Sequence, residues 1–165
     1  MYTYTVRPGD TLYSIAEDFR TPYQTILEAN TLPDPNIITP GQSIMIPGFP
    51  DPATIPYSIE VSIGQRQLTL FENRTVKKTY PVAVGRMLFE TPVGEFIIVN
   101  RAPNPGGPYG VLWLSLSRKG YGIHGTNDPS SIGQAVSRGC VRMFNEDVLE
   151  VGAIVPNGTR VTITP

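Results

Sequence analysis

A proline-rich segment constrains the fold of this chain more than any other feature of its sequence. Residues 49–56 carry prolines at positions 50, 52 and 56, and closely spaced prolines make a short, semi-rigid connection. A chain of 165 residues is long enough for two small domains, and the hydrophobic pattern differs on the two sides of the segment. We therefore predict a domain at 1–48, a linker at 49–56 and a second domain at 57–165, with the two domains close together.

The segment before the linker has the pattern of a small α+β unit. Residues 2–6 alternate and include β-branched side chains, which indicates a strand. A helix follows, and its apolar face consists of residues with helical spacing: Leu12, Ile15, Ala16 and Phe19. Thr21 is expected to cap a second helix, and residues 43–47 to form a last strand. The predicted order is strand, helix, helix, strand (βααβ).

Both ends of this unit resemble a LysM module. Residues 4–12 (Tyr-Thr-Val-Arg-Pro-Gly-Asp-Thr-Leu) and 38–42 (Ile-Thr-Pro-Gly-Gln) carry the resemblance. LysM modules bind glycans that contain N-acetylglucosamine, such as peptidoglycan and chitin, in a groove between two loops. The resemblance implies these glycan-binding residues: Gly9, Asp10, Thr11, Leu12, Asn36, Ile37 and Ile38. The alternative is that these residues serve only as turns and caps.

After the linker the hydrophobic period changes to two. Alternating segments separated by turn residues predict short strands at 57–63, 67–71, 75–84, 93–99, 111–117 and 160–164. Such spacing is typical of a β-sandwich or a barrel-like fold. A single short helix is expected from Asn145, with Asn145 as its N-cap. Trp113 is expected in the core, because it alternates within a strand.

Residues 124–142 contain the only histidine and the only cysteine of the chain, His124 and Cys140. A thiolate is a good nucleophile, and a neighbouring histidine can act as its base. Arg138 and Arg142 flank the cysteine, and their positive charges are expected to lower the thiol pKa. The N–H of Gly139 is a candidate oxyanion donor. The alternatives are a buried structural cysteine with a structural histidine, and a zinc site, for which the ligands are too few.

The same residues resemble the catalytic signature of the L,D-transpeptidases. The resemblance rests on His-Gly-Thr at 124–126, on Ser-Arg-Gly-Cys-Val-Arg-Met at 137–143 and on Thr-Pro-Val-Gly-Glu-Phe at 91–96. It implies that Cys140 attacks a peptidoglycan stem peptide and that His124 is its base. It also implies that the Gly125 carbonyl orients the imidazole. The expected product of the attack is a thioester, which a second stem resolves.

Several residues around this signature are candidates for binding substrate. These are Ser137, Arg138 and Tyr109. Many family members carry histidine where this chain has Arg138, so the part played by this arginine stays open. Arg142 either supports the site electrostatically or forms a structural salt bridge. Two alternative functions remain: a sortase-like cysteine transpeptidase, and a wall-binding protein without activity.

Charge and hydropathy exclude other classes of function. The net charge is −1 and no basic stripe is present, so we expect no nucleic-acid partner. No apolar run is long enough to span a membrane, and the first residues do not have the pattern of a signal peptide. No metal or cofactor is expected. The expected partner is peptidoglycan, which places the protein at a cell wall or a spore wall.

Overall fold

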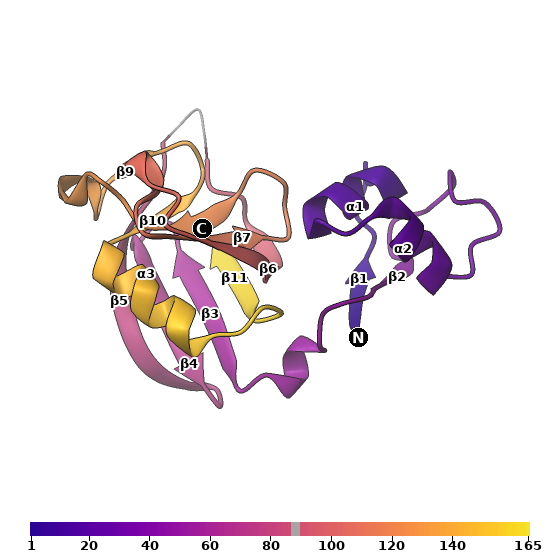
Figure 1. The fold of residues 1–165 in the computed structure, drawn as a ribbon, viewed down its shortest axis with the longest axis horizontal. Coiled ribbons are helices and arrows are strands. Elements are labelled where there is room, and N and C mark those ends of the chain that lie inside the picture. The colour runs from indigo at the N-terminus through magenta and orange to yellow at the C-terminus, as the bar shows by residue number, and fades with distance from the viewer. Residues whose placement is uncertain (87–89) are drawn as a thin grey trace.

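The computed structural model describes residues 1–86 and 90–165, which form two modules joined by a short linker (Figure 1). In the N-terminal module, two antiparallel strands pair along their length and two helices pack beside them. The observed order confirms the predicted βααβ unit. Its elements are β1 (Tyr2–Thr5), α1 (Leu12–Phe19), α2 (Tyr23–Ala29) and β2 (Ser43–Ile46).

Local sequence explains where the two helices begin. The Thr11 side chain accepts a hydrogen bond from the Ser14 backbone N–H, and the Ser14 hydroxyl accepts one from the Thr11 N–H, so α1 starts with a reciprocal capping box. All four predicted apolar residues of this helix are buried. The predicted N-cap of α2 is wrong by one residue. Pro22 holds that position, and the Thr21 hydroxyl donates to the Phe19 carbonyl instead.

The C-terminal module is a curved sheet of nine strands with one α-helix, α3 (Asn145–Ile154), which matches the predicted barrel-like fold with one helix. The sheet order is β10-β8-β7-β6-β11-β3-β4-β5-β9, and β10 also pairs with β5, which brings the two ends of the sheet together. Its strands are β3 (Tyr57–Ser62), β4 (Gln67–Glu72), β5 (Thr75–Gly85), β6 (Gly94–Pro103), β7 (Leu112–Leu116), β8 (Gly122–His124), β9 (Ala135–Ser137), β10 (Val141–Met143) and β11 (Arg160–Thr164).

Three of these strands, β8, β9 and β10, were not predicted. Each contains three residues, which is too short for a period of two to be recognised. Residues 1–86 and 90–165 also contain three 3-10 turns: η1 (Pro52–Thr54), η2 (Gly107–Tyr109) and η3 (Pro129–Ser131). In the described parts of the chain, no helix is long and apolar enough to cross a membrane.

The first residue of α3 departs from its predicted role. Phe144 is the N-cap, and no side chain caps this helix. Asn145 is the first helical residue, and its side-chain Oδ1 accepts a hydrogen bond from the Thr126 backbone N–H at 3.0 Å. The predicted cap is therefore wrong, because this side chain turns away from the helix toward the segment that follows β8.

Strand β6 has apolar side chains on both faces, and it packs against both modules. Phe96 and Ile98 lie in the core of the barrel. Ile97 and Val99 point the other way and are buried in the same cluster as the core of the N-terminal module. The two modules therefore share an apolar contact, in line with the expectation that a short linker keeps them close. The exact boundaries of the two domains remain a prediction.

Candidate active site

Three side chains stand in a row across adjacent strands at the centre of the candidate site. Trp113 of β7 pairs with His124 of β8, and His124 pairs with Arg142 of β10. Residues directly opposite each other on neighbouring strands project to the same face of a sheet. This row borders a cavity of about 500 Å³ lined by Arg86, Pro108, Tyr109, Trp113, Gly120, His124, Val136, Ser137, Arg138, Cys140 and Arg142.

The imidazole of His124 is buried and fixed in orientation. Only 3% of the residue is exposed. Its Nδ1 lies 2.5 Å from the carbonyl oxygen of Gly125, and a carbonyl can only accept, so Nδ1 carries the proton and Nε2 has the free lone pair. The pKa of His124 is lowered to about 4, mainly by burial and to a smaller extent by the charge of Arg142, while the hydrogen bond to the Gly125 carbonyl opposes both. The ring is therefore neutral at pH 7.

Two aromatic rings surround the imidazole. The Trp113 indole stacks on it at 5.2 Å with an interplanar angle of 6°, and the Tyr109 ring meets it edge-on at 5.2 Å. The Trp113 Nε1–H donates to the Ser115 hydroxyl at 2.7 Å, which fixes the indole. The expectation that Trp113 belongs to the core is wrong. Its side chain faces the cavity because the pairing register sets it beside His124.

The thiol of Cys140 lies beside the chain segment that leads into β8. Its Sγ is 3.7 Å from the Gly120 carbonyl oxygen. Burial raises the pKa of this thiol, while a backbone hydrogen bond from Gly122 and the charge of Arg142 lower it by smaller amounts. Arg142 acts on the thiol pKa in the expected direction, but the loss of solvation outweighs it, so the net shift is upward.

Ser137 organises the turn that presents the thiol. Its hydroxyl donates to the Cys140 carbonyl at 2.6 Å and accepts from the Gly139 N–H at 3.3 Å. The residue is only 2% exposed, so its hydroxyl serves the turn, although its backbone borders the cavity. Gly139 has φ +104°, and a Cβ there would lie 2.6 Å from the Tyr121 ring. Only glycine fits between this ring and the turn.

Arginine side chains surround the opening of the cavity. Arg142 donates from Nη1 to the Ser131 hydroxyl at 2.9 Å, and its buried Nε has no hydrogen bond to any residue in 1–86 or 90–165. No carboxylate in these ranges pairs with Arg142, so the structural salt bridge is not observed. Arg138 is exposed at the rim. Arg86, at the end of β5, also lines the cavity, and no motif in the sequence marked it.

Asn145 is a second residue whose part in the site the sequence did not reveal, and it holds the segment that directly follows His124. Asn145 Oδ1 holds the Thr126 N–H, and a Cβ on either Gly110 or Gly125 would come within 2.3 Å of that oxygen. The segment that follows His124 therefore passes tightly between α3 and the loop before β7. Gly110 and Gly125 are a sequence signal of close backbone packing, but their spacing alone does not reveal that they pack against Asn145.

The predicted glycan-binding residues lie in the loop between β1 and α1, at the first residue of α1, and in the loop between α2 and β2. Gly9, Thr11, Asn36 and Ile37 are exposed. Ile38 and Asp10 are partly buried, and the Asp10 carboxylate accepts from the Tyr4 hydroxyl and the Arg7 N–H. Leu12 is 2% exposed and belongs to the core of the module, so its side chain offers no surface to a ligand. The glycan-binding role of this set stays a prediction.

The described residues contain no group of three or more His, Cys, Asp or Glu side chains that could hold a metal ion. The chemistry of the cavity is thus that of one thiol, one neutral imidazole and several guanidinium groups.

Comparison with protein families agrees with this geometry. The model of the L,D-transpeptidase catalytic domain, YkuD, matches residues 56–163. The chain belongs to the L,D-transpeptidase family. The LysM domain model matches residues 4–47. Together these two domains imply binding to peptidoglycan and association with the cell wall. The sortase-like and the non-enzymatic alternatives are therefore set aside.

Two relatives align with this chain along essentially its whole length. The proteins that carry the name L,D-transpeptidase YkuD in Bacillus licheniformis and Bacillus subtilis are each 62% identical to this chain. The alignments cover 100% of both chains in the first case and 99% of both in the second.

Solved L,D-transpeptidase structures share the fold of the catalytic module. A crystal structure of an L,D-transpeptidase from Mycobacterium tuberculosis superposes with a TM-score of 0.61 at 19% identity over 67% of this chain, which spans 58% of the mycobacterial chain. The NMR structure of the catalytic domain from E. faecium L,D-transpeptidase gives a TM-score of 0.58 at 22% identity, over 66% of this chain and 96% of that one.

Proposed function

We propose that Cys140 is the nucleophile and His124 the base of an acyl transfer between peptidoglycan stem peptides. The observation that carries this proposal is their common position in one cavity. His124 lines it from β8 and Cys140 from the turn just before the neighbouring strand β10, and the Gly125 carbonyl leaves Nε2 of the imidazole as the acceptor of a proton. The family membership of the chain supports the same reaction class.

The first half of the reaction forms a thioester. Because the pKa of the thiol is raised and that of the imidazole is lowered, both groups are neutral at rest, and the proton moves as the sulfur attacks. Sγ bonds to the carbonyl carbon between the third and fourth stem residues, and His124 takes the thiol proton. The tetrahedral intermediate collapses with cleavage of the C–N bond, and His124 gives the proton to the leaving amine of the terminal D-amino acid.

We expect backbone N–H groups of the 139–140 turn to bind the oxyanion. The Gly139 N–H now donates to Ser137 at 3.3 Å, which is a long hydrogen bond. An anionic oxygen is a stronger acceptor than a neutral hydroxyl, so we expect this N–H to turn to the oxyanion as it forms. Arg142 gives electrostatic support, and Arg138 and Tyr109 at the cavity bind the carboxylates and backbone of the stem.

The second half of the reaction releases the enzyme. An amine from a second stem attacks the thioester carbonyl and gives a proton to His124, the C–S bond breaks as the new amide forms, and His124 returns the proton to the Cys140 thiolate. Attack by water would instead give a hydrolytic carboxypeptidase. The N-terminal module would hold glycan near the cavity and so raise the local concentration of stems. We place the activity at the cell wall, with a spore wall as the narrower alternative that a fluorescent fusion in sporulating cells would test.

The test is intact-mass spectrometry of the full chain mixed with a disaccharide-tetrapeptide and, separately, with a carbapenem. Structural neighbours include an L,D-transpeptidase from Mycobacterium tuberculosis with a faropenem-derived adduct and an LD transpeptidase in complex with imipenem, which motivates the second reagent. We expect a covalent adduct with each compound in the wild type and none in Cys140→Ala. A folded, reduced protein that forms no adduct with either compound would contradict the proposal.

A further inference from the structure

We propose that helix α1 of the N-terminal module positions the nucleophile, because it holds the turn that contacts the Cys140 thiol. This turn, residues 117–121, connects β7 to β8 and is called here the β7–β8 turn. One side of it is bound by the N-terminal module and the other side borders the active-site cavity. The inference rests on the proposed role of Cys140, and it gives the N-terminal module a second part beyond binding glycan.

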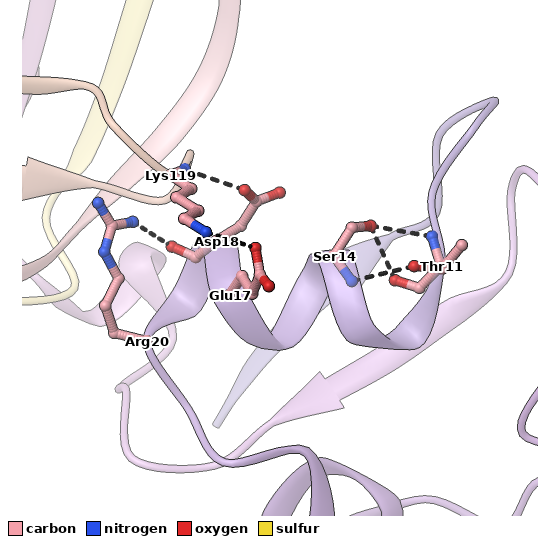
Figure 2. A network of polar contacts seen from close by, with 6 residues as sticks. All are labelled: Thr11, Ser14, Glu17, Asp18, Arg20 and Lys119. Carbon is pink, nitrogen blue, oxygen red and sulfur yellow. Dashed lines mark hydrogen bonds and ion pairs between the residues drawn. The ribbon is translucent and has the colours of Figure 1, made fainter.

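Three contacts near the end of α1 join the N-terminal module to this turn and to the last residue of β7, and Figure 2 shows the two that involve Lys119. The Asp18 carboxylate accepts a hydrogen bond from the Lys119 backbone N–H at 2.9 Å. The Glu17 carboxylate pairs with the Lys119 ammonium at 3.0 Å. Arg20 Nη1 donates to the carbonyl of Leu116, the last residue of β7, at 2.8 Å. Both a backbone donor and a backbone acceptor of this region are thus satisfied by the other module.

The opposite side of the same turn faces the nucleophile. The Gly120 carbonyl lies 3.7 Å from Cys140 Sγ, and the N–H of Gly122, the first residue of β8, hydrogen-bonds to the same sulfur. The Tyr121 ring packs against the backbone of Gly139, where a Cβ would lie 2.6 Å from the ring. The turn therefore supplies the groups that surround the thiol on this side.

Very little chain separates the two sets of contacts. Asp18 holds the N–H of Lys119, and the carbonyl beside the thiol belongs to the next residue, Gly120. Inside the turn, the Tyr121 N–H donates to the Arg118 carbonyl and the Leu116 N–H to the Tyr121 carbonyl. No residue lies between Lys119 and Gly120, so we expect a displacement of Lys119 to move the Gly120 carbonyl relative to the sulfur.

The contacts of α1 with the β7–β8 turn differ in strength, and the strongest of them is the one to remove in the test. The ion pair between Glu17 and Lys119 joins two exposed side chains, and such pairs contribute little. The Asp18 contact is a charge-assisted hydrogen bond to a backbone group, which is stronger and better defined in geometry. A separate contact between the modules, from Arg7 Nη2 to the Glu95 carbonyl at 3.1 Å, does not involve the turn and provides a matched control.

The experiment compares Asp18→Ala with Arg7→Ala and Glu17→Gln in the full chain. One readout is kcat and KM on a soluble stem tetrapeptide without glycan, for which tethering by the N-terminal module cannot matter. The other is the rate of Cys140 alkylation by iodoacetamide as a function of pH, which reports on the thiol whether or not the enzyme turns over. The charged and titratable groups facing the thiol (His124, Arg142, Arg86 and Arg138) are the same in every variant.

We expect Asp18→Ala to lower kcat by about 5-fold or more, the lower end of ordinary coupling between sites, with KM unchanged. Alkylation at neutral pH should be slower and its pH midpoint higher, because a loosened turn no longer holds the Gly122 N–H against the thiolate. Arg7→Ala and Glu17→Gln should match the wild type in both readouts. Circular dichroism melting confirms that each variant is folded.

Two results would overturn the inference. In the first, Asp18→Ala has wild-type kcat and wild-type alkylation. In the second, Arg7→Ala lowers both as much as Asp18→Ala does, which would indicate a general effect of docking. The proposed function fails separately: if the wild type does not turn over while Asp18→Ala still slows alkylation, the contact with the thiol stands and the assigned reaction is wrong.

Discussion

At the scale of single residues, burial acts in opposite directions on the two reacting groups. It raises the pKa of the Cys140 thiol and lowers that of His124, because burial disfavours the charged form of each. A preformed thiolate–imidazolium pair is therefore disfavoured, and the nucleophile is generated only during attack. Stacking of Trp113 on the imidazole contributes to this state by excluding water from one face of the ring.

The lowered pKa of His124 predicts a dependence of stability on pH. The pKa is about 4 in the folded protein against 6.5 for the free side chain. Above 6.5 the group is neutral in both states. As the pH falls from 6.5 toward 4, the unfolded chain binds a proton that the folded chain does not, so stability is lost. We expect a loss of roughly 3 kcal/mol from this residue.

Urea unfolding between pH 4 and pH 8 measures this effect. His124→Gln lacks the titrating group, so its free energy of unfolding should decline less steeply over the same range. Parallel curves for the two proteins would contradict the assignment.

Gly139→Ala should damage both stability and activity. Its φ of +104° is unfavourable for alanine, and the new Cβ would meet the Tyr121 ring. We expect a loss of about 1–3 kcal/mol and of most acyl transfer, because the turn that carries Cys140 must move. Gly133→Ala is the control. Gly133 also has positive φ, at +90°, but no atom lies within 4 Å of the new Cβ, so only the backbone cost should appear in thermal melts.

At the scale of elements, α3 contributes to the site through its first residue. Asn145→Ala removes the partner of the Thr126 N–H, which leaves a largely buried donor unsatisfied at a cost of about 1–3 kcal/mol. Since Thr126 lies two residues after His124, we expect kcat to fall by about tenfold, a change that corresponds to about 1.4 kcal/mol. Asn145→Asp keeps an acceptor oxygen and should restore much of the activity. An alanine variant with wild-type kcat would show that this contact is only structural.

The length of each element explains what could be predicted from the sequence. The βααβ module, the long strands and the single helix carry several periods of hydrophobic alternation, and they are present as expected. Strands β8 and β10 carry His124 and Arg142, yet each is three residues long and is held in place by pairing with distant segments. The motif therefore identified the residues His124 and Cys140, while the stacking of Trp113 and the support by Asn145 depend on register and packing that no local pattern contains.

At the scale of the whole molecule, the two modules share buried apolar surface through Ile97 and Val99. We expect a single cooperative transition in scanning calorimetry, with equal calorimetric and van't Hoff enthalpies. Ile97→Asp places a charge in this contact and should separate the transition into two. Val76→Asp, at an exposed position of β5, should leave one transition. Two transitions in the wild type would indicate that the modules unfold independently.

The two-sided strand β6 also has a consequence for synthesis. The N-terminal module has all of its own helices and strands once Ile46 has been made, but Ile97 and Val99, which cover its apolar side, emerge later. At ordinary translation rates of about 5–20 residues per second, this interval lasts roughly 3–10 seconds. During that time the nascent chain presents a half-covered apolar surface outside the ribosome, where a chaperone that recognises such surfaces would find it before the barrel closes.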